Sequence, residues 1–360
     1  MRVKVMKKNV IALSIVGAMS IPALANAVQV AGEELEVYAK AHMSLDMSDP
    51  DNTAVDSQTS ISSNDSYIGF KGKHKMENGM NALFQLEQQV NFDETGGTFA
   101  TRNSFAGLEG GFGTVLVGHH DTPFRDVAKK FDLFNETVGD RRAILGAGAT
   151  NGNRMNDRGE NMIMYKNKFG ATEFQFQHSF SNPTASVGGT LDDNENDMTS
   201  LGLFYSEGPL SVAGGYETWS DLLNNDSSEV SGIRLMGSYV FGKAKVGAIY
   251  ESTSSDDSAQ WERDAYGFNG SLDLGNNTAF NVQILMADDY DGTPDSGATK
   301  TTFGVSKKLE KRMEVYAVYT TTSNDDNASY QGIDGGHGDE MTTVPGGNPN
   351  ALSVGFIYSI

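Results

Sequence analysis

The chain has 360 residues, no cysteine and a formal net charge of −20 at pH 7. The absence of thiols excludes an exported disulfide scaffold and every thiolate metal site. The excess of acidic residues argues against nucleic acid as a partner. Length alone would allow two globular domains, but no linker-like change in composition divides the chain.

Residues 1–27 have the three parts of an export signal. Arg2, Lys4, Lys7 and Lys8 precede an apolar run at residues 10–19, and Ala25-Asn26-Ala27 has the small-x-small form of a cleavage site. The apolar run is too short to span a membrane, so we expect residues 1–27 to be a signal peptide that is removed. Without its four basic residues, and with all 47 acids retained, the mature chain has a net charge of −24.

Residues 28–360 alternate between apolar and polar side chains with a period of two, the pattern of strands with one apolar face. In residues 35–44 the apolar positions are Leu35, Val37, Ala39, Ala41 and Met43. Similar runs recur at residues 80–92, 233–241 and 280–286, and counting them predicts about sixteen strands. Tight turns such as residues 77–79 separate some strands, and longer polar loops such as residues 182–196 and 324–349 separate others.

A soluble β-sandwich would also alternate, but three features favour a membrane barrel. The predicted strands run to about ten residues, the length that crosses a bilayer at a tilt, whereas sandwich strands average about five or six. Short turns alternate with long loops, as they do when one rim is periplasmic and the other extracellular. Aromatic residues lie near strand ends, as in interfacial girdles. We therefore predict an all-β fold, a 16-stranded antiparallel transmembrane β-barrel formed by residues 28–360.

Residues 119–158 interrupt this series with a dense mixture of acidic and basic side chains. A connection of about forty residues is usually functional or disordered. Its apolar residues argue against disorder, namely Val127, Phe131, Leu133, Phe134 and Val138. We expect it to be an inward-folded constriction loop that narrows a pore. The alternative is a surface loop above the rim with one helical turn.

Seven short segments occur in an order and spacing typical of one family. They are residues 37–40, 68–72, 102–108, 111–115, 119–123, 131–134 and 157–165. Over the whole mature chain they resemble the general diffusion porins of Gram-negative outer membranes. The resemblance implies a sixteen-stranded barrel, commonly a homotrimer in the cell outer membrane, whose third extracellular loop folds inward.

The resemblance also implies a pore constriction in which loop acids face a basic cluster on the barrel wall. Carried over by position, the basic cluster consists of Lys40, Arg102 and Arg158. Tyr67 stands where many relatives place an arginine. The candidate acids are Asp132, Glu136 and Asp140, because a spacing of four places them on one side of a helical turn.

Opposed charges across a constriction create a transverse field that orders water and disfavours apolar solutes. We therefore expect a water-filled channel for passive diffusion of ions and small hydrophilic solutes, without catalysis or cofactor. The acidic mature chain predicts a weak cation preference. The alternatives are a substrate-specific channel and an outer-membrane barrel enzyme of the lipase or protease type, which would need a convergent nucleophile and base.

Two short motifs resemble metal sites, but no metal is expected at either. His119-His120-Asp121 lies far along the sequence from the other histidines, and residues 288–292 lack the closing glutamate of a calcium loop. Acidic pairs recur in the loops, namely Asp192-Asp193, Asp256-Asp257 and Asp325-Asp326. We expect them to form a solvated rim that binds divalent cations loosely and bridges lipopolysaccharide in the outer-membrane lipid.

Overall fold

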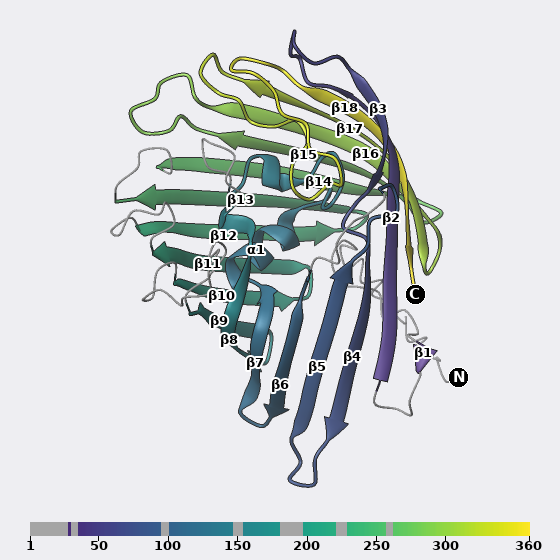
Figure 1. Ribbon diagram of the computed structural model, residues 1–360, viewed down its shortest axis with the longest axis vertical. Coiled ribbons are helices and arrows are strands. Elements are labelled where there is room, and N and C mark those ends of the chain that lie inside the picture. Colours follow the sequence, from purple (N-terminus) through teal and green to yellow (C-terminus); the bar gives the residue numbers. More distant parts are fainter. Residues whose placement is uncertain are drawn as a thin grey trace, which may run out of the picture.

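The computed structural model describes residues 28–29, 35–94, 101–146, 154–180, 197–220, 229–256 and 262–360. Within these ranges the strands form one antiparallel sheet that closes on itself as a barrel (Figure 1). The predicted signal peptide, residues 1–27, lies outside the described residues. None of the helices in the described ranges is long and apolar enough to cross a membrane.

Each strand pairs with its neighbour in the chain, and β18 pairs with β2 to close the ring. The strands are β1 (Val28–Gln29), β2 (Leu35–Asp49), β3 (Gln58–Ser63), β4 (Tyr67–Lys75), β5 (Asn81–Gln89), β6 (Ser104–Gly110), β7 (Gly113–Asp121), β8 (Arg158–Phe169), β9 (Thr172–Ser179), β10 (Met198–Glu207), β11 (Leu210–Ser220), β12 (Glu229–Phe241), β13 (Ala244–Ser255), β14 (Arg263–Gly275), β15 (Thr278–Ala287), β16 (Ala298–Glu310), β17 (Met313–Asn324) and β18 (Asn350–Ser359).

Of these elements, β1 is not a strand of the barrel, and β3 and β4 count together as one strand. β1 is a two-residue segment paired with the start of β2. β3 and β4 both pair with β2 and are two parts of one barrel strand, interrupted at residues 64–66. Among the described residues the barrel therefore has sixteen strands, which confirms the predicted fold class.

The strands have the predicted period of two. On β18, the side chains of Val354, Phe356 and Tyr358 are 52%, 38% and 41% exposed, whereas Ser353 is fully buried. Apolar side chains thus point outward and polar ones into the lumen, the reverse of a soluble protein. This distribution suits a barrel whose outer face contacts lipid.

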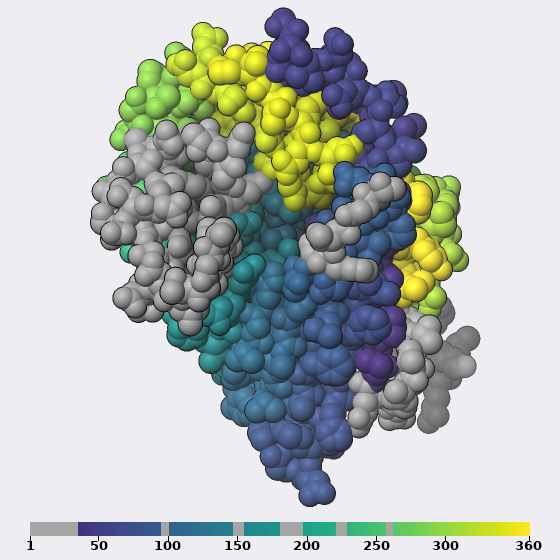
Figure 2. Space-filling view, in the orientation of Figure 1, coloured from purple at the N-terminus to yellow at the C-terminus, as the bar shows by residue number. Residues whose placement is uncertain are grey.

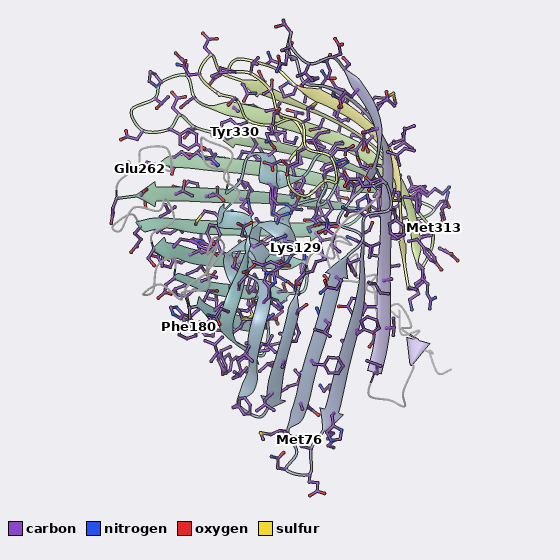
Figure 3. The ribbon with its side chains drawn as sticks, in the orientation of Figure 1. Met76, Lys129, Phe180, Glu262, Met313 and Tyr330 are labelled. Atoms are coloured by element: carbon purple, nitrogen blue, oxygen red, sulfur yellow. The ribbon has the colours of Figure 1, made fainter. Side chains whose placement is uncertain are left out.

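The connections alternate between short and long, also as predicted. Short turns join the strands at one rim, where Met76 and Met313 lie in Figure 3, and Phe180 and Glu262 lie at the opposite rim. Asn276 and Asn277 form one short turn with φ values of 52° and 59°. Two successive positive φ values make a type I′ turn, whose twist matches that of the flanking strands.

The connection between β7 and β8 contains the helix α1 (Pro123–Phe131) and the 3-10 turns η1 (Arg141–Ala143) and η2 (Arg154–Asn156). Thr122 caps α1 by accepting a hydrogen bond from the Arg125 N–H at 3.1 Å, and Pro123 occupies the first turn. α1 packs against the inner face of β9 to β13. In Figure 3, Lys129 on α1 lies between the two rims of the barrel.

Glycines on the inner wall make room for this connection. They are Gly202, Gly215, Gly232, Gly267 and Gly304, on β10, β11, β12, β14 and β16. A Cβ at Gly215 would lie 3.2 Å from the Phe124 Cα, and one at Gly267 would lie 3.0 Å from the Phe131 Cζ. Larger side chains at these positions would therefore push α1 and the residues after it away from the wall.

Candidate functional site

The segment that we predicted to fold inward is residues 119–158. The structure places residues 119–121 in β7 and Arg158 at the start of β8, so the connection itself is residues 122–157, named the inward segment below. Residues 147–153 of it lie outside the described ranges. Its five predicted apolar residues are at most 7% exposed. They pack in clusters with side chains of the inner wall, Phe134 and Val138 with Tyr316 and Val318 for example.

Polar side chains of the wall bind backbone groups of the inward segment. Arg234 donates to the Phe124 carbonyl at 2.9 Å, and Asn269 donates to the Phe131 carbonyl. The Leu133 N–H donates to Gln283 Oε1 at 3.1 Å. Of these groups, the Phe131 carbonyl is one that the end of α1 leaves unpaired, and the segment is attached to the wall by polar and apolar contacts together.

Glu136 lies against two of the three predicted wall residues. Its carboxylate forms an ion pair with Lys40, and Oε1 lies 4.0 Å from Arg102 Nη2. Burial alone would raise the pKa of Glu136, but Lys40, His42 and Arg102 hold this pKa well below its usual value. The carboxyl group is therefore ionised at neutral pH.

Tyr67 lies beside the same pair of cations. Its ring centroid is 5.0 Å from Lys40 Nζ and 5.1 Å from Arg102 Cζ. Arg102 also pairs with Glu87 at 2.7 Å and with Asp65 at 2.9 Å. Tyr67 thus contributes a cation–π surface at a position where an arginine would add a third positive charge.

The structure does not bring Asp132 and Asp140 to the wall cluster. α1 ends at Phe131 because the Asp132 carboxylate accepts the Phe134 N–H at 2.9 Å, a local turn that competes with the helix. Glu136 then has a positive φ of 63°. The three acids therefore share no helical turn, and the prediction from their spacing of four is wrong.

Asp132 and Asp140 instead pair with arginines of the inward segment itself. Asp132 lies 3.3 Å from Arg141 Nη1, and Asp140 lies 3.0 Å from Arg142 Nε. Burial alone would raise the pKa of Asp140, but Arg142 and Arg141 hold this pKa below its usual range. We did not select these two arginines from the sequence, although the adjacent run of residues 140–142 was a signal for a local charge pair.

Arg158 belongs to a second charge cluster. Its Nε lies 2.9 Å from Asp121 Oδ1. The same carboxylate is 3.6 Å from Arg125 Nε and 3.3 Å from Lys129 Nζ. Three cations thus surround one carboxylate.

A cavity of 440 Å³ lies beside these groups. Its charged lining comprises Asp65, Asp93, Glu94, Asp157 and Glu340 together with Arg125, Arg142 and Arg158. Acidic and basic side chains from different elements therefore face a shared polar space, which is the arrangement required for a transverse field.

Side chains of the two metal-like motifs lie within hydrogen-bond distance of backbone groups. His120 Nδ1 lies 2.8 Å from the Asp121 carbonyl, and Asp289 accepts the N–H groups of Ser296 and Gly297 at 2.7 and 2.8 Å. No group of three His, Asp or Glu side chains in the described part of the chain is arranged to hold a metal ion.

Comparisons with known proteins agree with this architecture. A family model described as Gram-negative porin matches residues 12–327. The chain is 27% identical over 272 residues to outer membrane porin protein 32 from Delftia acidovorans, covering 72% of this chain and 75% of that protein. It is 31% identical over 121 residues to major outer membrane protein P.IB from Neisseria gonorrhoeae, and spans about a third of the length of that relative (34%).

Among solved structures, the chain is similar to an anion-selective porin from Comamonas acidovorans. The TM-score is 0.76 at 21% sequence identity, over 91% of this chain and 99% of that one. This likeness shows the same barrel fold. Because the family match covers most of the sequence, the chain belongs to the Gram-negative porin family, whose place is the bacterial outer membrane, and is not an enzyme.

Proposed function

We propose that the protein is a water-filled channel for passive diffusion of ions and small hydrophilic solutes across the outer membrane. The observation that supports this most is the inward segment, which is buried against the inner wall and places Glu136 beside Lys40 and Arg102. A barrel without such a segment would leave a wide lumen. The segment narrows it to a passage bounded by charged groups.

The charge clusters around Arg102 and around Asp121 differ in their balance. Around Arg102, the three acids Asp65, Glu87 and Glu136 are balanced by Arg102, Lys40 and Arg142. Around Asp121, three cations share one carboxylate. A field across the passage favours solutes that can reorient polar groups and disfavours apolar ones.

The predicted constriction residues have two roles in this proposal. Lys40, Tyr67, Arg102, Glu136 and Arg158 bound the passage directly. Asp132 and Asp140 act through Arg141 and Arg142, whose positions they fix. Residues 119–158 remain our proposal for the constriction loop.

We further propose a weak cation preference. The mature charge of −24 attracts cations to the mouth, and five acids against three arginines line the cavity. The cluster around Asp121 opposes this effect, and the similar Comamonas protein is named anion-selective. The net preference should therefore be small and should fade as salt rises.

Planar bilayers test the channel and the role of the inward segment together. Purified protein should give stepwise conductance, and deletion of residues 129–140 should increase the size of each step. Absence of steps, with a known porin active in the same bilayers, would contradict the channel. If a folded deletion variant gave conductance steps of wild-type size, this would contradict the role of the inward segment in narrowing the pore, but not the channel itself.

The assembly and the processing of the chain are also proposals. The resemblance to porins, of which a similar structure is named a trimer form, supports a homotrimer, which light scattering in mild detergent tests by mass. Exposed acids on the long-loop rim, Asp256, Asp325 and Asp326, would bind divalent cations that bridge lipopolysaccharide, and chelation should then weaken that association. Terminal sequencing of the membrane form should begin at Val28 if residues 1–27 are a signal peptide.

A further inference from the structure

The connection between β17 and β18, residues 325–349, is named the last outer loop below. The sequence predicts only a long polar loop here. In the structure it bends over the inner face of the barrel (Figure 1), and four of its apolar side chains are at most 7% exposed. They are Ala328, Tyr330, Ile333 and Met341. A loop that was only a solvated cap would not bury such side chains.

The buried side chains of the last outer loop pack on the inward segment. Ile333 and Met341 share a cluster with Leu133, Phe134 and Val138. Lys300 on β16 donates to the Gly332 carbonyl at 2.5 Å, which fixes the loop to the wall as well. Figure 2 shows this loop, in yellow, next to the recessed middle of the molecule.

Ile333 and Met341 also form the base of a small hairpin. They pair as an isolated antiparallel bridge, with the Met341 N–H donating to the Ile333 carbonyl at 2.9 Å and the Gly332 N–H to the Met341 carbonyl at 3.1 Å. Residues 334–340, named the tip below, lie between these paired residues.

One side of the tip is seated on the charge pair of the inward segment. Arg142 Nη1 donates to the Gly335 carbonyl at 2.7 Å. A Cβ at Gly336 would overlap the side chains of Arg142 and Asp140, so any larger residue at this close approach would force them to shift. The tip therefore helps to hold the Arg142 guanidinium in its position beside Asp140.

The other side of the tip is fixed to the first strands of the barrel. His337 Nε2 lies 3.1 Å from Asp46 Oδ2, and the Gly338 N–H donates to Asn64 Oδ1 at 2.9 Å. The Ser62 hydroxyl donates to the Asp339 carboxylate at 2.5 Å. The tip thus spans from the inward segment to β2 and β3.

The tip also forms part of the polar cavity. Gly335, His337, Gly338 and Glu340 line it alongside Arg142 and Arg158. We propose that residues 334–340 are a second constricting element, which sets the size limit of the channel together with the inward segment and fixes Arg142 at the edge of the passage. This inference rests on the proposed channel function.

The test is a variant in which residues 334–340 are replaced by Asn-Gly. Because Ile333 and Met341 are already paired, a two-residue type I′ turn closes the hairpin and keeps its apolar base. We expect single-channel conductance to rise about twofold as the passage widens. In liposome-swelling assays, the rate of trisaccharide entry divided by the rate of pentose entry should be higher for this variant than for the wild type. Loss of three acids and release of Arg142 should shift the reversal potential towards anions.

A charge control neutralises three exposed acids outside the tip, as Asp56→Asn, Asp288→Asn and Asp291→Asn. This triple variant should keep the conductance and the sugar limit of the wild type. Wild-type conductance and sugar limit in a folded tip variant would overturn the inference, while steps from the wild-type protein would still uphold the proposed channel.

A second pair of variants decides the question if the shortened chain does not fold. Gly336→Val should change conductance and selectivity, because its side chain would displace Arg142. Gly111→Val is the matched control, because a Cβ there has no neighbour within 4 Å. Identical channels from both variants would mean that the tip is not seated on Arg142 and would overturn the proposal.

Discussion

Glu136 offers the sharpest test of the electrostatic argument. Glu136→Gln removes one negative charge and changes side-chain volume little. Lys40 then loses its ion-pair partner, whereas Arg102 keeps Glu87 and Asp65. The passage therefore gains one unit of positive charge without losing the arginine that bounds it.

The size of the effect follows from Coulomb's law. A monovalent ion passing about 6 Å from the altered charge, at a dielectric constant of about 80, changes its energy by about 0.7 kcal/mol. That is a factor of about 3 in local concentration, and since anions gain what cations lose, the permeability ratio should move by about tenfold. In 1 M salt the screening length falls to about 3 Å, so most of the change should disappear.

The assay is the reversal potential across a planar bilayer in a potassium chloride gradient, at low and at high salt. Asp56→Asn removes the same charge from an exposed loop and is the matched control. If both variants shift the reversal potential equally, or if the Glu136 variant shifts it towards cations, the assignment of Glu136 to the passage is refuted.

Three further predictions concern other parts of the lumen. Arg158→Ser should shift the reversal potential towards cations, opposite in sign to Glu136→Gln, because Asp121 keeps Arg125 and Lys129 as partners; an anion shift would contradict this. Burial raises the pKa of Asp334 from 3.8 to about 6, because the buried carboxyl is more stable when it is protonated. The folded state is therefore favoured most below pH 3.8, and this advantage is lost as the pH rises through about 6. Asp334→Asn should therefore raise the thermal unfolding midpoint at pH 7.5 more than at pH 3.5, as followed by circular dichroism. Gly215→Val should leave the barrel folded but alter its conductance, because the added side chain meets Val127 and the backbone of Phe124, whereas Gly237→Val, with no neighbour within 4 Å, should match the wild type in the same bilayers.

The barrel could be predicted because strand periodicity is a local property of the sequence. Each residue on β18, for example, faces lipid or lumen according to its position in an alternating run. The break between β3 and β4 could not be predicted in this way. Asp65 has a positive φ of 50° there, and its carboxylate pairs with Arg102 from a distant part of the chain. Such a contact leaves no periodic signal.

The site was harder to predict than the fold for the same reason. The resemblance located Lys40 and Arg102, and the structure places Glu136, which was selected by a spacing argument that fails, beside both of them. The extension of a helix through Asp132 failed because one side-chain hydrogen bond ended it. The burial of the last outer loop could not be predicted, because its buried side chains are scattered among glycines and acids, without a period that points to one face.

The glycines beneath α1 have a consequence for the order of folding. They lie on strands β10 to β16, all of which follow α1 in the chain. The surface that receives the helix therefore does not exist until those strands have paired. The lumen must be filled after the wall has formed. Substitutions that weaken this docking should accordingly leave barrel assembly intact and appear only as a change in what passes through it.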